Sequence, residues 1–399
     1  MLTEKQLLNY ADVLIWGLKT ARSGKYKKGD IVLIRYNVPA LRLAEILNEK
    51  LLKIGINPVL RMGTTPVMER NFFDIADSKQ LIFTAPGEEE LYKNINGSIF
   101  LHAPESITHL RGINPNKIGK ATVARKHLKD ILDKREEEGA FGWTLCMLPT
   151  EELAKHARLT IKEYTNEIAA ACFLNKKSPV EQWQKVFQDA VRIKKWLNGM
   201  KVKSFHIESE NTDLEITPGD KRKWIGISGH NIPSFELFLS PDWRCTKGIY
   251  FANQPSYRSG NYVENVRLEF KKGEAVKIEA KTGEEFVKNQ LAMDKGANKI
   301  GEFSLTDKRF SKINKFMANT LFDENYGGSF GNCHIALGSS YSDTFSGNPK
   351  DLTKEIKKNL GFNDSALHWD LVNTEKKRVT AKLASGKTVT IYENGKFMI

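Results

Sequence analysis

Short apolar runs alternate with longer helical patterns along the first half of the chain. The short runs, rich in Val, Ile and Leu, lie at 30–37, 57–62, 97–104 and 142–149. The helical patterns, in which apolar residues recur about every three to four positions, lie at 38–55, 120–139 and 151–173. Such alternation is typical of a mostly parallel sheet with helices on both faces, and it predicts an α/β domain.

The pattern changes after a long amphipathic helix that is predicted at 178–199. Beyond it, polar and apolar residues alternate between Gly, Asn and Ser turns at 203–219, 223–229, 261–283 and 378–395. This texture is typical of antiparallel strands joined by tight turns. We therefore predict an α/β domain at 1–177, a connecting helix at 178–199, and a β-rich α+β domain at 200–399 that carries the candidate catalytic residues.

The N-terminal residues predict an amphipathic helix rather than a targeting segment. Thr3 and Gln6 form a capping-box pattern ahead of apolar residues at helical spacing. The longest uninterrupted apolar run, 168–174, is far too short to span a bilayer. The four cysteines are far apart and lack the spacing of a disulfide scaffold. These features favour a soluble cytoplasmic protein with no membrane partner.

Composition and charge narrow the class of partner. The 399 residues carry a formal net charge of +13, which would suit an anionic partner. Lys and Arg are spread along the whole chain rather than gathered into a basic block, so nucleic-acid binding is not favoured. No G-x-G-x-x-G or Walker A sequence follows a predicted strand, and a nucleotide cofactor is therefore unsupported.

Four predicted strands of the second half place an acid or an imidazole among apolar residues. Glu236 lies in SFELFLSP, Glu302 in GEFSL, His334 in CHIAL, and both His368 and Asp370 in LHWDLV. Successive residues of a strand point to opposite faces, so His368 and Asp370 share one face of the last strand. The neighbouring Trp and Leu residues share the other face.

A carboxylate in such a setting needs a partner, because an unpaired buried charge costs several kcal/mol. Neither Glu236 nor Asp370 has a Lys or Arg within four positions in the sequence. Divalent metal ions would balance these charges, and mixed carboxylate and imidazole ligands suit zinc, cobalt or manganese. Three or more carboxylates favour two ions that share oxygen ligands.

The pair His206 and Glu208 has the same spacing as His368 and Asp370 but lies in a different setting. Its segment, HIESENTD, is polar almost throughout. We therefore interpret this segment as a solvated strand edge and its histidine–acid spacing as a chance match.

The ordered segments SFELFLSP, GEFSLTD, LFDENYGG with CHIALGSSY, and HWDLV resemble the thermophilic metalloaminopeptidase family. The likeness extends through the second half in order and spacing, and the α/β first half agrees with that family's N-terminal domain. The resemblance implies an aminopeptidase that releases N-terminal residues from peptides by means of a water activated by two divalent metal ions. It implies zinc, cobalt or manganese, with magnesium as a further option, and a homodimer.

The resemblance also assigns roles to residues. It implies a set of metal ligands made of Glu236, Glu302, Glu324, His334, His368 and Asp370. Glu302 or Glu324 would act as the general base. Tyr341, seven positions after His334, would donate a hydrogen bond to the oxyanion.

One segment departs from the family pattern. Glu324 and His334 are ten residues apart across NYGGSFGNC, which is longer than in many family members. This glycine loop could reshape the pocket or displace Glu324 from the metals. A phosphate-cradling role for its glycines is the alternative to a plain turn, and turns are the commoner use of such residues.

Two other functions use similar ligands. A dinuclear phosphoesterase is the first alternative, although no cluster of Arg or Lys lies beside the motifs to hold a phosphate. A non-catalytic protein with a bound metal is the second, although structural sites usually use Cys and His rather than several carboxylates.

Overall fold

The structure, a computed structural model, describes residues 1–348 and 351–399. The chain divides into two compact units. Unit 1 comprises Met1–Trp183 with Ser228–Pro233, and unit 2 comprises Gln184–Ile227 with Ser234–Ile399. The domain boundaries expected from the sequence, after residues 177 and 199, stay a prediction, because compactness alone does not define which parts fold independently.

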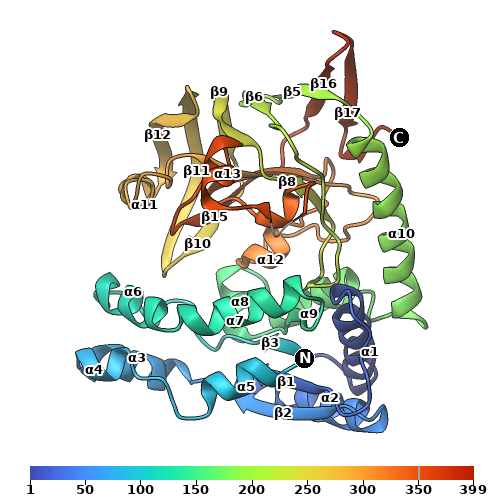
Figure 1. The fold of residues 1–399 in the computed structure, drawn as a ribbon, viewed down its shortest axis with the longest axis vertical. Helices are drawn as coiled ribbons and strands as arrows, with labels where there is room; N and C mark the ends of the chain where they lie inside the picture. Colours follow the sequence, from blue (N-terminus) through green and yellow to red (C-terminus); the bar gives the residue numbers. More distant parts are fainter. Residues whose placement is uncertain (349–350) are drawn as a thin grey trace. The chain divides into compact units, whose positions relative to one another are not determined.

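Unit 1 is built on a five-stranded parallel sheet with the order β2-β1-β3-β4-β7 (Figure 1). Its strands are β1 (Ile31–Tyr36), β2 (Asn57–Met62), β3 (Gly97–His102), β4 (Gly142–Met147) and β7 (Asn231–Ile232). The consecutive residues Val32, Leu33 and Ile34 are all buried. Because they point alternately to the two faces, both faces of the sheet are covered, and the predicted α/β class is confirmed.

Helices connect the strands of unit 1. They are α1 (Glu4–Ala21), α2 (Leu41–Lys53), α3 (Pro66–Ile75), α4 (Ser78–Leu81), α5 (Glu88–Asn94), α6 (Pro115–Ala124), α7 (Lys126–Glu137), α8 (Glu151–His156), α9 (Ile161–Ala171) and the 3-10 turn η1 (Val38–Ala40). The first helix begins as predicted, because Thr3 and Gln6 make both hydrogen bonds of a capping box. Among all the described residues, no helix combines the length and the apolar character needed to cross a membrane.

Two helices expected to be continuous are each divided. The pattern at 120–139 contains a break at Arg125, which ends α6 and precedes α7. The pattern at 151–173 is interrupted after α8, where Arg158 has a φ of 58° and Thr160 caps α9 with a new capping box. The expectation of single helices was wrong because apolar periodicity continues across a break, whereas caps determine where a helix ends.

Unit 2 is rich in antiparallel strands, as predicted. Its larger sheet has nine strands in the order β10-β11-β9-β6-β5-β16-β17-β18, with β12 paired to β11. These strands are β5 (Val202–Glu208), β6 (Asp213–Thr217), β9 (Asp242–Ala252), β10 (Ser256–Arg258), β11 (Asn261–Lys271), β12 (Glu274–Thr282), β16 (Arg378–Leu383), β17 (Thr388–Glu393) and β18 (Lys396–Phe397).

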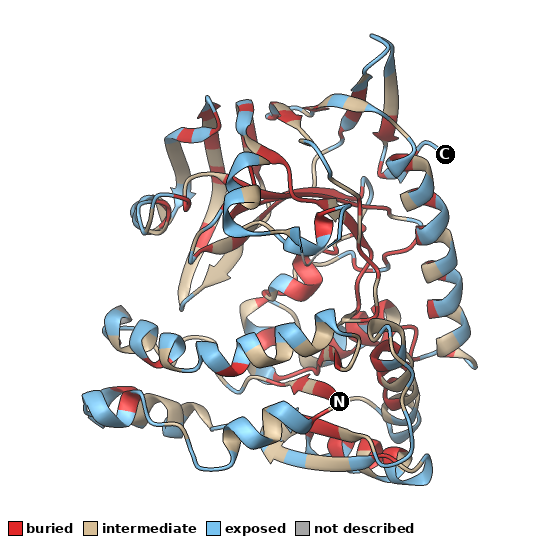
Figure 2. Ribbon diagram, in the orientation of Figure 1, coloured by how far each residue is buried: buried red, intermediate tan, exposed pale blue. Residues whose placement is uncertain are grey.

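A smaller sheet of unit 2 has the order β15-β14-β13-β8. Its strands are β8 (Glu236–Leu239), β13 (Ile300–Thr306), β14 (Asn332–Gly338) and β15 (His368–Asn373). Every residue of β13 and β14 is buried, and both strands are red in Figure 2. Both faces of this sheet are therefore covered, which agrees with the apolar character of its sequence.

The helices assigned wholly to unit 2 are short. They are α11 (Glu284–Leu291), α12 (Thr320–Asp323), α13 (Lys354–Asn359) and the 3-10 turn η2 (Ser342–Thr344). The predicted connecting helix is present as α10 (Pro179–Asn198), whose residues from Gln184 onward belong to unit 2.

The prediction of a strand at 223–229 was wrong. Only an isolated bridge forms in this segment, between Ile225 and Phe238. Gly226 and Ile227 have φ values of 121° and 50°, which interrupt an extended backbone immediately after the bridge. Alternation of apolar residues predicted a strand here, but the backbone turns.

The segment around His206 is solvent-exposed, as predicted, but it does not form an edge strand of the sheet. The His206 side chain is 39% exposed, and its Nε2 lies 2.8 Å from a carboxylate oxygen of Asp213. The strand that carries it, β5, is paired on both sides, with β6 and β16. The polar residues therefore mark the solvated face of an interior antiparallel strand, a situation that the sequence pattern does not distinguish from an edge.

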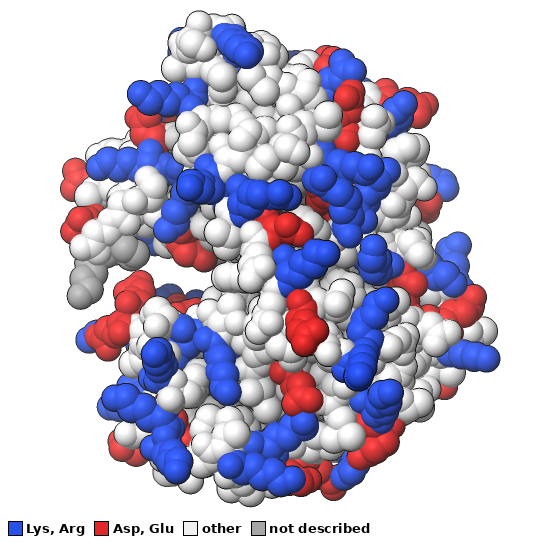
Figure 3. Space-filling model, turned by 90° about the vertical axis from the view of Figure 1, so that its right-hand side faces the viewer, with Lys and Arg blue, Asp and Glu red and all other residues white. Residues whose placement is uncertain are grey.

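Surface charges are mixed rather than segregated on the face shown in Figure 3, where Asp and Glu lie between Lys and Arg. This distribution agrees with the spread of basic residues along the sequence.

Lys377, at 3% exposure, makes the stability of the fold depend on pH. Burial lowers the pKa of Lys377 to about 8. Between this pKa and the ordinary value near 10.5, the unfolded chain binds more protons than the folded one, so stability rises with pH. Relative to the Lys377→Met variant, we expect wild type to gain about 2 kcal/mol of unfolding free energy between about pH 7 and pH 10. Urea unfolding of both proteins at both pH values measures this gain. If the unfolding free energies of wild type and Lys377→Met differ by the same amount at pH 7 and at pH 10, the prediction is contradicted.

Candidate metal centre

The small sheet of unit 2 brings most of the candidate residues onto one face. Glu302 on β13 pairs with Ala336 on β14, and Ala336 in turn pairs with Asp370 on β15. Gly338 pairs with His368 in the same way. Because residues opposite each other in a sheet share a face, the register places Glu302, His368 and Asp370 together.

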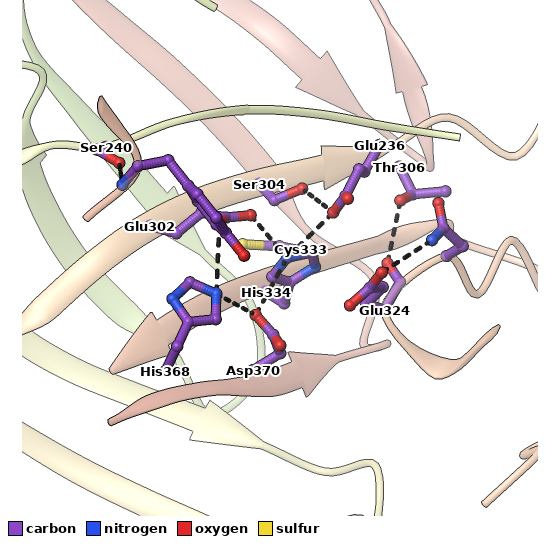
Figure 4. A network of polar contacts seen from close by, with 12 residues as sticks. Glu236, Ser240, Glu302, Ser304, Thr306, Glu324, Cys333, His334, His368 and Asp370 are labelled. Carbon is purple, nitrogen blue, oxygen red and sulfur yellow. Dashed lines mark hydrogen bonds and ion pairs between the residues drawn. The ribbon is translucent and has the colours of Figure 1, made fainter. Parts of the chain in front are cut away.

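His334 lies on this face between the other candidate residues, on β14, one of the two inner strands. Its Nε2 is 3.3 Å from Oε2 of Glu236 and 3.2 Å from Oε1 of Glu302 (Figure 4). The Nε2 of His368 is 3.7 Å from the other oxygen of Glu302, Oε2, and 3.5 Å from Oδ1 of Asp370. The two oxygens of Glu302 therefore face different histidines.

The ligand atoms form two overlapping groups. In the described chain, Glu236, Glu302 and His334 offer ligand atoms that all lie within 4.8 Å of one another, and so do Glu302, His368 and Asp370. Glu302 belongs to both groups. Carboxylates and imidazoles in such groups are the donors that zinc, cobalt and manganese accept, so these residues fit divalent ions.

Small residues leave room between these side chains. Ala336 lies between Glu302 and Asp370 in the register and carries only a methyl group. Gly338, opposite His368, has a φ of 101°, and a Cβ at this position would lie 2.1 Å from the carbonyl oxygen of Leu367. A larger residue at 336 would extend over the face on which the ligand atoms converge, whereas a side chain at 338 would collide with the backbone of Leu367.

A hydroxyl group and a carbonyl group orient two of the ligands. Ser304 Oγ donates a hydrogen bond to Oε2 of Glu236, with a length of 3.2 Å. The Nδ1 of His368 contacts the carbonyl oxygen of Ser339 at 2.9 Å, which directs its Nε2 towards the carboxylates. The sequence analysis did not identify Ser304. It could have done so, because Ser304 is a polar residue in an apolar strand, two positions after Glu302 and therefore on the same face.

Glu324 lies beside the two groups rather than in either of them. It follows α12, is buried, and lines the same pocket as Asp370. Its neighbours fix it, because Asp323 accepts hydrogen bonds from the N–H groups of Met317 and Asn319. Asn325 accepts one from the N–H of Phe235, next to Glu236. The segment Asp323–Asn325 is therefore hydrogen-bonded to the backbone just before β8.

The glycine loop before His334 is a plain turn. The N–H groups of Gly327 and Gly328 both donate to the carbonyl oxygen of Ile313, so they are not free to cradle a phosphate. At the end of the loop, Asn332 donates to the carbonyl oxygen of Glu324 at 3.0 Å. The loop therefore anchors the backbone of Glu324. Whether its length displaces the Glu324 side chain from bound metals stays a prediction.

Tyr341 lies at the exposed side of the site, with 44% of its surface accessible. Its ring contacts those of His368 and Phe238, with centroids 4.8 and 5.6 Å away, and its N–H donates to Ser240 Oγ at 2.8 Å. Although the residue is partly accessible, desolvation by the surrounding protein, followed by the charge of Glu302, raises the pKa of Tyr341 above its ordinary value. The phenol therefore stays protonated and able to donate a hydrogen bond.

Burial changes the proton affinities of the ligands themselves. It raises the pKa of Glu236 to about 8, and it also raises the pKa of Glu302. Burial alone would lower the pKa of His334, but its hydrogen bond with Glu302 and the charges of nearby carboxylates raise it to about 9. A cluster of buried carboxyl and imidazole side chains of this kind holds protons near neutral pH unless cations replace those protons. This is a further reason why divalent ions fit the site.

One basic residue contributes from a distant part of the sequence. Arg258 on β10 donates to the carbonyl oxygen of His368 at 2.9 Å. Burial opposes a low pKa for Asp370, but His368, and to a smaller extent the charge of Arg258, lower it. Sequence proximity could not reveal this contact, because more than one hundred residues separate the two. A single arginine does not balance the carboxylates of the site.

An α/β unit together with a β-rich unit whose buried carboxylates and imidazoles converge is the arrangement of a metal-dependent hydrolase. The family model described as thermophilic metalloprotease (M29) matches residues 3–397. The chain therefore belongs to this metalloprotease family, and the resemblance inferred from its motifs is confirmed.

Relatives agree with this assignment, and a solved structure shares the fold. Aminopeptidase AmpS of Bacillus subtilis is 31% identical, over 78% of each chain. Aminopeptidase PepS of Streptococcus thermophilus is 25% identical, over 93% of this chain and 94% of its own. The structure of wild-type AmpT from Thermus thermophilus has the same fold, with a TM-score of 0.80 at 21% identity, over 98% of this chain and 99% of its own.

Proposed function

We propose that this chain is an aminopeptidase that uses two divalent metal ions to hydrolyse the first peptide bond of peptides with a free N-terminus. The observation that carries this proposal is the position of Glu302, whose two oxygens belong to two different groups of ligand atoms. The names of the relatives support peptides as substrates.

The chain's residues divide into two sets of ligands. Glu236, Glu302 and His334 would hold one ion, and Glu302, His368 and Asp370 would hold the other. Zinc, cobalt and manganese suit these ligands, with magnesium as a less favoured option. When bound, such ions lower the pKa of a water molecule and polarise a carbonyl group.

The position of Glu324 supports a role in proton transfer. Glu324 lines the same pocket as Asp370, and burial raises the pKa of its carboxyl group well above the ordinary value. We propose that it takes one proton from the attacking water as the C–O bond forms, and returns this proton to the nitrogen as the C–N bond breaks. The ligand role that the resemblance implies for Glu324 remains a separate prediction.

The hydroxyl group of Tyr341 is proposed to stabilise the oxyanion that forms on the substrate carbonyl. The Tyr341→Phe variant lacks this donor but keeps the ring that packs on His368. We expect its kcat to fall by ~10²–10³-fold, with metal content unchanged. Steady-state kinetics and elemental analysis measure these quantities. Unaltered turnover would remove Tyr341 from the mechanism.

The substrate class is tested by comparing blocked and free peptides. The proposal expects hydrolysis of Leu-Gly-Gly and no hydrolysis of its N-acetyl form, since a free amine defines the exopeptidase. A phosphodiester such as bis(p-nitrophenyl) phosphate is the third substrate, and we expect it to be stable. Equal cleavage of the acetylated peptide would sink the exopeptidase assignment, and preferential cleavage of the phosphodiester would favour a phosphoesterase.

We also propose a homodimer, for which the resemblance and exposed apolar side chains in unit 1 provide support. Val67, Ile75, Phe83 and Val123, in or next to α3, α4 and α6, are each more than 60% exposed. Large apolar side chains that are exposed in one chain can be covered by a partner, although scattered ones are also common on monomers. The mass in solution tests this proposal, while the cytoplasmic location stays a prediction.

A further inference from the structure

A serine, a histidine and a glutamate of unit 1 form a chain of polar contacts that shares no residue with the candidate metal centre. Ser228 Oγ lies 2.7 Å from Nδ1 of His230, and Nε2 of the same imidazole lies 2.8 Å from Oε1 of Glu136. Ser228 and His230 lie just before β7, whereas Glu136 belongs to α7. Serine, imidazole and carboxylate in this order are the groups of a nucleophile, its general base and the acid that orients the base.

Glu136 is held by two donors, and its acceptor role sets the direction of each hydrogen bond. Its Oε1 faces His230, and its Oε2 accepts a hydrogen bond of 3.3 Å from Nε1 of Trp143. Because an ionised carboxylate can only accept, Nε2 of His230 donates to Glu136. In the neutral imidazole the other nitrogen, Nδ1, is then an acceptor, and the hydroxyl group of Ser228 donates to it. The imidazole is thus arranged to remove a proton from the serine.

Ser228 occupies a tight turn of the backbone. The residues on either side of it have positive φ angles, 50° at Ile227 and 91° at Gly229. A positive φ is unusual for a β-branched residue such as isoleucine and marks local strain. In the described chain, no backbone carbonyl group accepts a hydrogen bond from the N–H of Ser228 or of Gly229. Serine nucleophiles of hydrolases often lie on such strained turns, where N–H groups of the turn stabilise the oxyanion.

The three side chains are accessible from solvent. Those of His230 and Glu136 are 22% and 32% exposed, and Ser228 is half-buried. The ring of Trp143 lies beside the imidazole, with ring centroids 4.4 Å apart. The site is therefore open to small molecules, and the indole provides an apolar surface for the acyl or aryl part of a substrate.

We infer that Ser228 and His230 are the catalytic residues of a second hydrolytic site, which acts on small carboxylic esters, and that Glu136 positions the imidazole. Ser228 Oγ forms a bond with the ester carbonyl carbon while its proton passes to Nδ1 of His230. The ester C–O bond then breaks, and the alcohol leaves with this proton. A water molecule attacks the acyl group in turn, gives a proton to Nδ1, and releases the carboxylic acid as that proton returns to Oγ.

Covalent labelling of the whole chain in its metal-loaded form tests the nucleophile. A fluorophosphonate reacts when Oγ forms a bond to phosphorus and displaces fluoride, while the serine proton passes to the imidazole. We expect mass spectrometry of peptides to find the label on Ser228 and not on Ser385, an exposed serine between β16 and β17. The His230→Asn variant should react ~10²-fold more slowly or less, the usual loss for a general base. The matched control is His206→Asn, which removes a histidine that contacts Asp213 and should leave the rate unchanged.

Hydrolysis of p-nitrophenyl acetate tests turnover. We expect this activity to persist in the Glu302→Gln variant, in which the metal centre is impaired, and to be lost when Ser228→Ala is added. The Glu136→Gln variant should have a lower kcat with KM unchanged, because the amide group of glutamine can donate to Nε2 and so favour the wrong tautomer of His230. A general rearrangement of the turn would change KM as well.

These outcomes are separate from those that test the proposed function, since none of them depends on peptide hydrolysis. Absence of the label from Ser228, or equal labelling rates in wild type and His230→Asn, would overturn the inference even if the chain is an aminopeptidase. Ester hydrolysis that survives Ser228→Ala would also overturn it. If Ser228→Ala fails to fold, a Glu136→Gln variant with wild-type kcat on the ester is the result that contradicts the inference.

Discussion

The Glu302→Gln variant is expected to lose at least ~10³-fold in kcat/KM, because the contribution of a metal ion to transition-state stabilisation amounts to several kcal/mol. It should also bind fewer metal ions than wild type. Glutamine has the shape of glutamate, but its amide nitrogen cannot act as a ligand to a cation. Since the two oxygens of Glu302 face His334 and His368 separately, the loss of either oxygen disrupts one group of ligands.

Steady-state kinetics and elemental analysis after dialysis measure the effects of Glu302→Gln. The matched control is Glu208→Gln, whose side chain is 54% exposed near His206, outside the site. The control should retain the activity and metal content of wild type. A Glu302→Gln enzyme that keeps two ions per chain would contradict the role of this carboxylate as the shared ligand.

The Glu324→Gln variant is expected to lower kcat by ~10²–10⁴-fold, the usual contribution of a general base. The reason is chemical, since an amide cannot accept the proton of the attacking water. Its metal content should remain that of wild type, because Glu324 lies outside both groups of ligand atoms. The backbone contacts that anchor Glu324, made by Thr306 and Asn332, do not involve its side chain.

Steady-state kinetics and elemental analysis of the Glu324→Gln variant separate two roles for Glu324, that of general base and that of metal ligand. Loss of a metal ion together with activity would establish it as a ligand, as the family resemblance implies. Activity close to that of wild type would exclude both roles. A pure effect on kcat with two ions retained is the outcome that the position of Glu324 predicts.

The candidate site could be predicted from the sequence to a large extent, because strand geometry is local. Alternation of faces predicted that His368 and Asp370 point the same way and that Trp369 points oppositely. The register between strands then brings Glu302 next to them, so that several acids and imidazoles converge, as a site for divalent ions requires. An acid in an apolar strand is a strong signal because its burial needs compensation.

Contacts between residues that are far apart in the sequence could not be predicted from local sequence patterns. Arg258 contacts His368 only because β10 lies against β15. Asn325 supports Glu236 through the backbone of Phe235, which is ninety residues away. The division of helices at Arg125 and Arg158 was missed because apolar spacing does not record a change in backbone angles.

The central claim, a two-ion aminopeptidase, is tested most directly by titrating metal-free protein with zinc, cobalt or manganese while measuring hydrolysis of a free peptide and of its N-acetyl form. The account predicts that hydrolysis of the free peptide is absent without metal, rises with added ion, and reaches its plateau when two ions are bound per chain. The acetylated peptide should remain intact throughout. Full activity with one ion bound, or activity that persists without metal, would contradict it.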